Sequence, residues 1–521
     1  MTGAQTLHEI FNAVARSTPD KVAAIASSGQ TRTYGELSER ATAIATALHS
    51  HGLTYGDRVC LMLDNCMEWV ETFFACLQAG YVAVPANPDW TPSELTYLLN
   101  HSEAKAVICR PESADHMERA EGFTPGEPIL FVTGDGDLFG KPGQMPYRDL
   151  LTAGPAAAQE LSAPDPTATA IIAYTSGTTS GTPKGVALSH RTILELGLAY
   201  GRVVNATDRD RCLFVTPLFH LNAVGAVLGA FSVGASIVFQ QRFSSSSFWR
   251  LVDTYRPTYL FSMGTILNIL MTLRPGPLER QHDMRAMYVL GVGAAAQATE
   301  DRYSVAVVDG YGMSEYPCGT YTPVGEPRKS GSAGKPFYPG HMRIQLDDGT
   351  EAAPGQTGEV LFLAEHSFDG YFADPELTSE SFSGPWFHTG DLGYLDDDGY
   401  FFFVDRKKDI IRRGGENVSS LQVEEVLRSS PEVVDVAVVP VPDDVLGERI
   451  AAVVVAAPGA KPSLESLRAH AAKSLAQVKL PESLAMVDSL PRTPTGKIQK
   501  FAVRNALRAE AATVEQRTPA V

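Results

Sequence analysis

The sequence predicts an α/β protein with a large N-terminal domain of doubly wound αβ subdomains plus a small β unit, followed by a small, mobile C-terminal α+β domain. Helix and strand patterns alternate over the first four hundred residues, which is typical of parallel sheets with crossover helices. A chain of 521 residues is too long for one hydrophobic core. We therefore expect an N-terminal domain over residues 1–405, a hinge over 406–409 and a C-terminal domain over 410–521.

The first elements follow from the spacing of apolar residues. Apolar residues from Leu37 to Leu48 fall on one helical face, and Gly52 supplies a C-terminal stop. Strand and helix patterns then alternate as strand Arg58–Leu63, helix Glu68–Gln78, strand Tyr81–Pro85, a helix that starts at Thr91-Pro92, and strand Ala106–Cys109.

Glycine, proline and charged residues become more frequent after Pro323, and we expect a smaller β unit there. Its short strands are spaced by Gly349, Gly355 and Gly358. The run Asp405–Asp409 then places five charged residues between two apolar stretches. Such runs are usually solvated turns, but its place between two folding units favours a hinge. The following patterns predict helices near Val423–Ser429 and Leu464–Leu475 and strands at Val433–Val441 and Ile450–Ala456.

Composition excludes several classes of protein. The chain is 44% hydrophobic and 20% charged, as is usual for a globular protein. Its net charge of -17 disfavours binding to nucleic acid or to an anionic membrane, and we expect neither as a partner. No apolar run has transmembrane length and no secretion signal is apparent, so we expect a cytoplasmic protein. The six cysteines form no C-x-x-C pair, which predicts neither a cysteine zinc site nor a disulfide framework.

The segment Tyr174–Gly185 is the most informative part of the chain and reads YTSGTTSGTPKG. It holds three glycines, six serine or threonine hydroxyls and one lysine, directly after the apolar run Ala170–Ala173. Glycines let a backbone approach a ligand closely, while N–H groups, hydroxyls and a lysine bind oxyanions. A flexible turn has a similar composition. The lysine and the preceding strand favour a cradle for a polyphosphate.

This loop differs from the common P-loop, which reads G-x-x-x-x-G-K-[ST] and opens a helix. Here Gly177, Gly181 and Lys184 have another spacing, and the apolar residues after Lys184 continue as a short strand. Only at Ser189 does a helix cap appear, ahead of residues 191–203. We therefore expect the phosphates to be held by a loop between two strands, which argues against a P-loop kinase or ATPase.

Five segments together resemble the adenylate-forming superfamily, which includes acyl-CoA synthetases and the AMP-dependent synthetase and ligase family. They follow the family's order and span nearly the whole chain: the loop Tyr174–Gly185, YGMSE at 311–315, TGD at 389–391, DRKKD and GGEN at 405–409 and 414–417, and PTGKI at 494–498. The resemblance implies the adenylate-forming enzyme fold and an acid–thiol ligase. ATP would activate a carboxylic acid as an acyl-adenylate with release of pyrophosphate, and CoA would then form the thioester.

The resemblance also implies which residues hold the phosphates. Lys184 and the loop donors would hold the β- and γ-phosphates, and the donors are Thr175, Ser176, Gly177, Thr178 and Thr179. Glu315 would help hold Mg²⁺, a hard ion suited to carboxylate and phosphate oxygens. Ser314 would reach the α-phosphate, where a hydroxyl suffices. Lysine and metal are needed because an anionic acid must approach a polyanion.

Other residues would bind the nucleoside and the transition state. Tyr311 would pack near the adenine, with Gly312 next to it, and Asp391 would accept hydrogen bonds from the ribose hydroxyls with Arg406 beside it. Lys497 would bridge the carboxylate, the α-phosphate and the ribose. Glu315, Asp391 and Lys497 could each be an ordinary surface residue. Their motifs occur in the same order as in the family, and this favours a catalytic role for them.

His220 lies in TPLFHLN and matches the family's aromatic–histidine segment beside the acid. We interpret His220 as a gate to the acyl pocket, since a carboxylate is already ionised near pH 7 and needs no base. Amino-acid-activating members of the family place an aspartate near this segment to pair the substrate ammonium. No acidic residue accompanies His220 and Asn222, so the resemblance favours an acid without an α-amino group. Small residues dominate the rest of the expected pocket and predict a bulky or extended acid: Gly225, Gly264, Gly291, Gly293 and Ala294.

The C-terminal region carries the expected second half-reaction. Lys408 stands at the family's hinge position, and Gly414 and Gly415 would flank the tunnel for the CoA pantetheine. After GGEN the family usually reads I-x-P-x-E-[IV]-E, whereas this chain has VSSLQVE at 418–424. The missing proline and first glutamate leave adenylation intact but weaken the case for efficient CoA transfer.

Four alternatives remain from the sequence. The nearest is an acyl-AMP ligase that passes the acyl group to a carrier protein or a separate transferase. An ATPase or kinase would release ADP instead of AMP. A non-catalytic binding module would be expected to lack Lys497 or Glu315, and both are present. Nothing in the sequence favours luciferase chemistry. The acid, the acceptor and the oligomeric state are not predicted.

Overall fold

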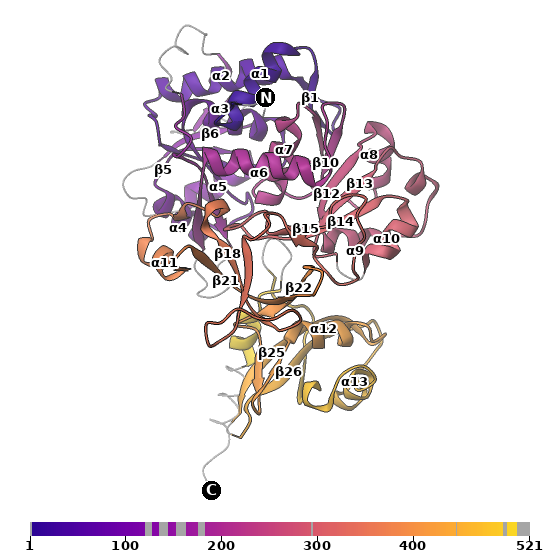
Figure 1. Cartoon of the computed structure of the whole chain (residues 1–521). Coiled ribbons are helices and arrows are strands. Elements are labelled where there is room, and N and C mark those ends of the chain that lie inside the picture. The colour runs from indigo at the N-terminus through magenta and orange to yellow at the C-terminus, as the bar shows by residue number, and fades with distance from the viewer. Residues whose placement is uncertain are drawn as a thin grey trace. The chain divides into compact units, whose positions relative to one another are not determined.

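The computed structural model describes residues 3–119, 128–134, 144–152, 163–175, 183–292, 295–443, 445–492 and 498–507 (Figure 1). By internal contacts the chain divides into two units. The first comprises Met1–Thr175, Lys184–Met342 and Phe362–Phe387, and the second Ser176–Pro183, Arg343–Leu361 and His388–Val521. These units are defined by contacts within each unit, whereas the domains expected from the sequence are consecutive stretches of chain. The expected boundary at residue 405 and the hinge at 406–409 stay predictions.

Unit 1 contains two large sheets. The nine-stranded sheet has the order β16-β15-β14-β13-β12-β10-β11-β1-β2, and its strands from β14 to β1 in that order are parallel. Its strands are β1 (Val22–Ala26), β2 (Thr31–Thr33), β10 (Arg211–Phe214), β11 (Ser236–Phe239), β12 (Tyr259–Met263), β13 (Ala286–Leu290), β14 (Ala306–Tyr311), β15 (Thr320–Tyr321) and β16 (Lys335–Pro336).

The eight-stranded sheet has the order β19-β9-β8-β4-β3-β5-β6-β7. Its strands from β8 to β7 in that order are parallel, and β9 and β19 are antiparallel additions. Its strands are β3 (Arg58–Met62), β4 (Val82–Pro85), β5 (Ala104–Cys109), β6 (Ile129–Val132), β7 (Gln144–Pro146), β8 (Thr169–Thr175), β9 (Lys184–Ser189) and β19 (Gly370–Tyr371).

Helices and sheets of unit 1 form five alternating layers. One cluster of buried side chains joins a face of each sheet to the helices α1 (Leu7–Ser17), α2 (Tyr34–Ser50), α3 (Met67–Ala79), α6 (His190–Val203) and α7 (Leu221–Ser232). The outer face of the nine-stranded sheet packs against α8 (Phe248–Tyr255), α9 (Gly264–Thr272) and α10 (Ala296–Tyr303). The outer face of the eight-stranded sheet packs against α4 (Pro92–Ser102) and α5 (Pro111–Arg119).

Local sequence explains where these helices begin and end. Thr33 with Glu36, and Thr91 with Glu94, form capping boxes at the starts of α2 and α4. At the end of α3, Gly80 has a φ of +67°, a conformation that favours glycine. The alternating helices and strands predicted between Leu37 and Cys109 are confirmed, with shifts of one or two residues at their ends.

Glycines let α6 and α7 pack closely side by side (Figure 1). A Cβ atom on Gly197 of α6 would lie 3.1 Å from the carbonyl oxygen of Leu228, and one on Gly229 of α7 would lie 2.9 Å from Tyr200 Cβ. A larger residue at either position would force the helices apart, which is costly in a close-packed core.

A smaller five-stranded sheet follows, with the order β17-β18-β21-β20 and β22 paired with β21. Its strands are β17 (Met342–Gln345), β18 (Gly358–Leu363), β20 (Phe382–Ser383), β21 (Trp386–Leu395) and β22 (Phe401–Arg406), and the short helix α11 (Pro375–Glu380) precedes β20. The described parts of the chain include 3₁₀ segments at Tyr147–Leu151, Pro277–Arg280, Ala364–His366 and Gln477–Lys479. This sheet is the small β unit that the glycine spacing predicted.

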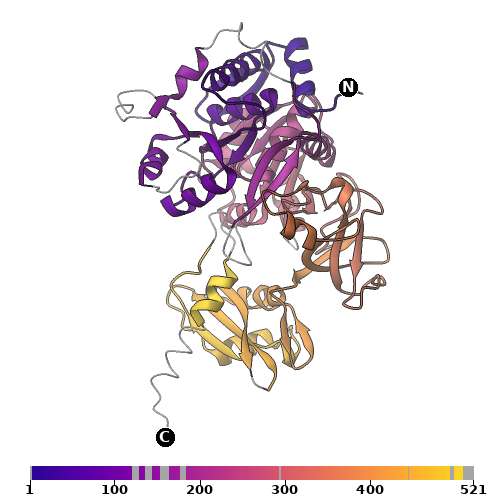
Figure 2. The same ribbon diagram turned by 90° about the vertical axis from the view of Figure 1, so that its left-hand side faces the viewer.

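Unit 2 ends in a second five-stranded sheet, of order β24-β23-β26-β25 with β27 paired with β26. Its elements are β23 (Ile411–Arg413), β24 (Glu416–Val418), α12 (Ser420–Arg428), β25 (Val433–Asp443), β26 (Gly447–Ala456), α13 (Leu464–Ala471) and β27 (Ser483–Met486). Alternate residues face opposite sides: Val436 and Val438 pack with α12 and α13, whereas Ala437 and Val439 pack with the terminal segment 498–507. Figure 2 shows the yellow helical turn of that segment against the orange strands of this sheet. The two helices and two strands predicted here are confirmed.

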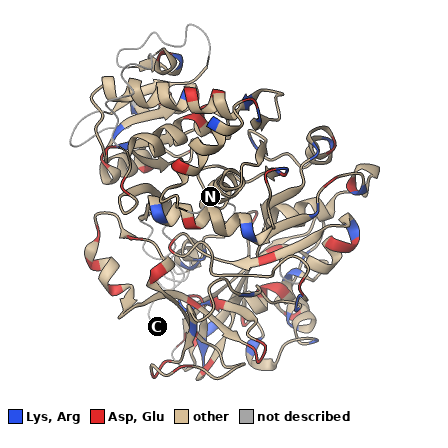
Figure 3. Cartoon of the chain, turned by 45° about the horizontal axis from the view of Figure 1, so that its top comes forward, with Lys and Arg blue, Asp and Glu red and all other residues tan. Residues whose placement is uncertain are grey.

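Charged residues of both signs are interspersed along the elements (Figure 3). None of the helices in the described ranges is long and apolar enough to cross a membrane. All six cysteines are free thiols and lie buried or half-buried.

Candidate active site

Several predicted site residues lie at one edge of the nine-stranded sheet. Carboxyl ends of parallel strands meet at the same edge, where α/β proteins usually bind ligands. His220 follows β10, Gly264 follows β12, Gly291 follows β13, and the segment Tyr311–Glu315 starts at the end of β14. These strands are neighbours in the sheet, so the topology gathers residues that are far apart in the sequence.

The phosphate loop joins β8 to β9, which are antiparallel neighbours. Thr175, the last residue of β8, lies opposite Lys184, the first residue of β9. The strand after Lys184 and the Ser189 cap are confirmed, because the Ser189 side chain accepts a hydrogen bond from the Thr192 N–H. The predicted loop donors Ser176, Gly177, Thr178 and Thr179 lie outside the described residues.

Tyr371 connects the phosphate loop to the predicted metal ligand. The Lys184 ammonium lies 4.9 Å from the centre of the Tyr371 ring, a cation–π contact. The Tyr371 hydroxyl donates a hydrogen bond to Glu315 Oε1 at 3.0 Å. Burial, and then the charge of Glu315, raise the pKa of Tyr371, so this hydroxyl keeps its proton and acts as the donor. One side chain therefore contacts both groups that would face a nucleotide's phosphates.

Ser314 and Glu315 lie at the tip of a tight turn. Met313 and Tyr316 exchange two backbone hydrogen bonds, each 3.1 Å long, which leaves only these two residues between them. The Phe368 N–H also donates to the Glu315 carbonyl at 2.8 Å. Such a turn presents the serine hydroxyl and the glutamate carboxylate together, as a phosphate and metal site requires.

Gly312 and Tyr311 precede this turn. A Cβ atom on Gly312 would lie 2.4 Å from the Pro317 carbonyl oxygen, so glycine is needed there for a close backbone approach. The rings of Tyr311 and Phe362 are nearly parallel with centroids 6.1 Å apart. The place of Tyr311 beside an adenine stays a prediction.

The segment before His220 is held by a buried asparagine of the other sheet. Asn65 follows β3 and donates hydrogen bonds to the carbonyls of Thr216 and Gln240, both at 3.1 Å. Asn65 also accepts one from the Leu218 N–H at 2.7 Å. These contacts join the carboxyl edges of the two sheets and position the chain two residues before His220.

His220 is the N-cap residue of α7, and its ring lies 4.4 Å from that of Phe219. The buried Asn222 accepts a hydrogen bond from Thr216 Oγ1 at 3.3 Å. In the described parts of the expected pocket, residues 220–226, 262–265, 291–292 and 311–313, no Asp, Glu, Lys or Arg is present. His220 is the single titratable group there apart from Tyr311.

Two further predicted pocket residues touch each other. A Cβ atom on Gly264 would lie 2.3 Å from the Gly291 carbonyl oxygen, and Gly291 itself has a φ of +74°. The buried Asp309 fixes this loop, because its Oδ1 accepts hydrogen bonds from the N–H groups of Gly291, Val292 and Gly310 at 3.1, 3.4 and 2.8 Å. Gly293 and Ala294 lie outside the described residues.

Close packing against neighbouring groups, and not open space, explains why two of the expected pocket residues are glycines. A Cβ atom on Gly225 would lie 2.6 Å from the Tyr200 ring of α6, and the space beside Gly264 is filled by the Gly291 carbonyl. From the sequence alone, these glycines predict a roomy pocket. The structure gives them another cause, so their small size does not measure the width of the pocket.

In unit 2, Asp391 is buried on β21 and pairs in register with Arg406 of β22, with the Arg406 Nε 3.6 Å from Asp391 Oδ1. The preceding Gly390 has a φ of +69° and donates its N–H to Glu359. Burial alone would raise the pKa of Glu359, but the hydrogen bond and charge of Lys407 hold it below its usual value. This ion pair helps to hold the part of β21 that carries Asp391.

The hinge candidate Lys408 is half-buried. Burial, and then the nearby Arg406, lower its pKa to about 8, and Arg504 donates a hydrogen bond to the Lys408 carbonyl at 3.1 Å. The neighbouring Asp405 is buried and accepts hydrogen bonds from Ser420 Oγ at 2.7 Å and the Leu421 N–H at 3.2 Å at the start of α12. This segment is therefore tied to α12 as well as to β22.

Gly414 and Gly415 form the two-residue turn of the hairpin between β23 and β24. Both have positive φ angles, +56° and +85°, as a type I′ turn requires. This turn explains why glycines are needed here without reference to CoA. Lys497, the predicted bridge to the transition state, lies outside the described residues.

Sequence reasoning missed Tyr371, Asn65 and Asp309. Tyr371 and Asn65 act across 56 and 151 residues of sequence, so no local pattern points to them. Asp309 is the exception, because an acidic residue inside an otherwise apolar strand is a signal for a buried polar role.

Comparison with known proteins finds matches along nearly the whole chain. Residues 11–372 match the AMP-binding enzyme family and residues 422–497 match the AMP-binding enzyme C-terminal domain. Crotonobetaine/carnitine–CoA ligase of Proteus mirabilis (strain HI4320) is 32% identical over 513 residues, covering 96% of this chain and 98% of that protein. Sulfoacetate–CoA ligase of Cupriavidus necator is 32% identical over 513 residues, covering 96% and 97%.

A solved structure is similar over the same length. The anthranilate CoA ligase AuaEII, crystallised in complex with anthranoyl-AMP, has a TM-score of 0.88 and 27% identity and covers 97% of this chain and 98% of that one. This likeness confirms the predicted fold class, an α/β N-terminal part with a small C-terminal domain.

Proposed function

Since this chain belongs to the AMP-binding enzyme family and is an AMP-forming acid–CoA ligase that works through an acyl-adenylate, we propose how its own residues perform the reaction and which acids it accepts. The observation that carries the proposal is the contact of Tyr371 with both Lys184 and Glu315. Tyr371 thus contacts both the strand that starts at Lys184 and the turn that carries Glu315.

In the first half-reaction a carboxylate oxygen attacks the α-phosphorus of ATP, and the bond to the β-phosphate breaks. Lys184 offsets the charge of the departing pyrophosphate, and Ser314 donates to the α-phosphate. The oriented Glu315 carboxylate is a suitable ligand for Mg²⁺, which when bound neutralises phosphate charge. Asp391 accepts from the ribose hydroxyls, Arg406 stands next to it, and Lys497 contacts the reacting oxygens.

In the second half-reaction the CoA sulfur attacks the acyl carbonyl carbon, and AMP leaves. Lys408 is the hinge and the Gly414-Gly415 turn flanks the entering pantetheine. The substituted VSSLQVE segment makes this step the slower one in our proposal. Six free cysteines fit the reducing cytoplasm that we propose as its location.

The acid that we propose has an uncharged, apolar part larger than acetate and no α-amino group; the proposed size follows the aromatic acid of the similar AuaEII structure and not the pocket glycines. Charged residues are missing from the described pocket segments, and an unpaired charge buried there would be costly. The two relatives are ligases of crotonobetaine or carnitine and of sulfoacetate, so charged acids are substrates elsewhere in the family.

Product analysis tests the reaction. The enzyme is incubated with ATP, Mg²⁺ and a panel of acids, with and without CoA, and AMP, ADP and pyrophosphate are measured. We expect acid-dependent AMP release that CoA stimulates. Pyrophosphate exchange without a CoA effect would favour the acyl-AMP ligase, and ADP as the product would exclude the adenylation mechanism.

The same panel tests the acid. Benzoate and medium-chain fatty acids should support pyrophosphate exchange, whereas carnitine, sulfoacetate and free amino acids should not. Exchange with acetate alone, or only with a charged acid, would contradict the proposed pocket.

A further inference from the structure

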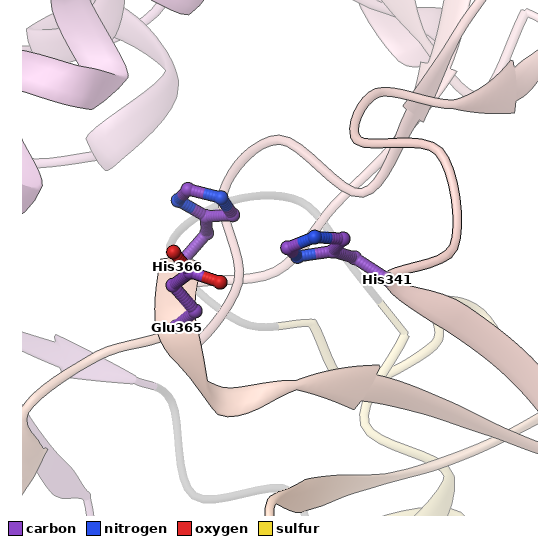
Figure 4. Close-up of side chains that lie close together, drawn as sticks. All are labelled: His341, Glu365 and His366. Carbon is purple, nitrogen blue, oxygen red and sulfur yellow. The ribbon is translucent and has the colours of Figure 1, made fainter.

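Two histidines and a glutamate that the adenylation site does not use lie close together in unit 1 (Figure 4). One ring nitrogen each of His341 and His366 and one carboxylate oxygen of Glu365 all lie within 4.8 Å of one another. Donor atoms around a tetrahedral zinc ion are about 3.4 Å apart, because Zn–N and Zn–O distances are about 2.0–2.1 Å. We propose that His341, Glu365 and His366 form a binding site for a divalent cation of the zinc class.

His366 is held in the orientation that a metal ligand needs. Its Nδ1 lies 2.9 Å from Glu195 Oε2 of α6, and its ring stacks on that of Tyr338 with centroids 3.6 Å apart. When Nδ1 donates its proton to Glu195, Nε2 carries the lone pair. Metal-binding histidines usually have such a carboxylate partner on the second nitrogen, which fixes the ring and raises its basicity.

His341 supplies a second, independent sign of a ligand. Its Nδ1 is shielded from solvent and has no hydrogen-bond partner among the described residues. Buried side-chain nitrogen atoms normally have a partner, because leaving one unsatisfied is costly. A cation would satisfy it. The His341 and His366 rings are only 5.0 Å apart, and the Leu363 N–H bonded to the His341 carbonyl keeps the two segments together.

The donor set selects the type of cation. Two imidazoles and one carboxylate suit Zn²⁺ and similar transition metals, whereas Mg²⁺ prefers oxygen ligands. Cys318 lines a small cavity with Tyr338 and His366, but its sulfur is not among the donor atoms that lie within 4.8 Å of one another. A bound cation would link α6, through Glu195, to the loop before β17 and to the segment that leads to Phe368, whose N–H supports Glu315.

Zinc titration of the chelator-treated, full-length protein against a chromophoric competitor tests this site. We expect one Zn²⁺ per chain, not displaced by excess Mg²⁺. The double variant H341A/H366A should lose this binding, and Glu195→Gln should weaken it about 10–100-fold, as is usual for the partner of a ligating histidine. The matched control is His51→Ala, which removes an exposed histidine away from the cluster and should leave the binding unchanged.

X-ray absorption of the zinc-loaded protein supplies a readout that is independent of catalysis. We expect scattering from imidazole and oxygen ligands. Sulfur ligands, undiminished binding by the double variant, or no stoichiometric binding by the wild type would each overturn the proposal. If circular dichroism shows that the histidine variants are unfolded, the exposed Glu365→Gln takes their place and should weaken binding; unchanged affinity would then overturn the site.

Discussion

The Tyr371 hydroxyl lies 3.0 Å from Glu315 Oε1 and donates a hydrogen bond to it. Glu315 stands at the tip of a two-residue turn, where a carboxylate has many orientations open to it. The hydrogen bond selects one of them. The Tyr371 ring also contacts the ammonium of Lys184. The orientation of the Glu315 carboxylate is therefore tied to the strand that follows the phosphate loop.

Tyr371→Phe should lower kcat/KM for MgATP about tenfold or more, because a hydrogen bond to a charged group contributes about 1.5–3 kcal/mol. The ring remains, so the contact with Lys184 and the thermal midpoint should change little. Steady-state pyrophosphate exchange at several Mg²⁺ concentrations measures the effect. The control is Tyr303→Phe, because the Tyr303 hydroxyl has no hydrogen-bond partner in the described ranges. Equal activity of the two variants would contradict the role of Tyr371.

Lys497→Ala should lower the rate of adenylation by about 10²–10³, the loss expected when one transition-state donor is removed. ATP binding should be nearly unchanged. Single-turnover formation of the acyl-adenylate separates the two effects. Lys473→Ala, an exposed lysine of the same unit, is the control. A rate for Lys497→Ala within a few-fold of the wild type would remove Lys497 from the transition state.

Gly264→Ala should both destabilise the protein and impair acid binding. The added Cβ would lie 2.3 Å from the Gly291 carbonyl oxygen, so the loop after β13 must move. Overpacking of this kind costs about 1–3 kcal/mol. Denaturant unfolding and KM for the acid measure the two effects. Gly276→Ala is the control, since nothing lies within 4 Å of its added Cβ; equal stability of both variants would argue against this close contact.

Lys408 should titrate near pH 8, since burial and neighbouring cations lower its pKa from 10.5 to about 8. Its charged form is disfavoured in the folded state. The resulting cost to stability is present below about pH 8 and disappears as the pH rises from 8 to 10.5. The stability of the wild type relative to Lys408→Met should therefore rise over this range.

The titration itself is visible by NMR after ¹³C-methylation of the lysines, and the shifted resonance should be missing in Lys408→Arg. Removing the neighbouring cation in Arg504→Met should move the pKa of Lys408 back toward its usual value. An unshifted resonance for Lys408 in the wild type would contradict the burial of its ammonium.

Lys500→Met should destabilise the C-terminal sheet by about 3–5 kcal/mol, the cost of removing one partner from a buried ion pair. Lys500 Nζ lies 2.8 Å from Glu424 Oε1, and the two side chains are 11% and 3% exposed. Adding Glu424→Gln should recover most of the loss, because no buried charge is left. Urea unfolding measures both, with the exposed Lys473→Met as control. No recovery in the double variant would mean that packing, and not charge, causes the loss.

Local patterns predicted the elements well and the tertiary contacts poorly. The alternation from Leu37 to Cys109, the strand after Lys184 and the Ser189 cap all follow from neighbouring residues, and the structure confirms them. The contact of Tyr371 with Glu315 depends on the pairing of β19 with β9, which no local pattern specifies. Contacts of this kind can be identified only once the three-dimensional fold is known.

Small residues illustrate a second limit of predicting a site from the sequence. A glycine in the sequence indicates that a side chain does not fit, but it does not tell what occupies the space. At Gly225 and Gly264 the occupants are the Tyr200 ring and a backbone carbonyl, and not a substrate. At Gly414 and Gly415 the cause is a turn with positive φ. The residues of the adenylation site therefore stay predictions that the variants above test.

The helical layer shared by the two large sheets limits how relatives of this protein can be recombined. Helices α1, α2, α3, α6 and α7 contribute side chains to one common core with both sheets. A chimera that exchanges one sheet but keeps the original helices would place new side chains of that sheet against helices that still fit the other sheet. A crossover point between β22 and β23, ahead of the C-terminal sheet that has hydrophobic clusters of its own, avoids that penalty.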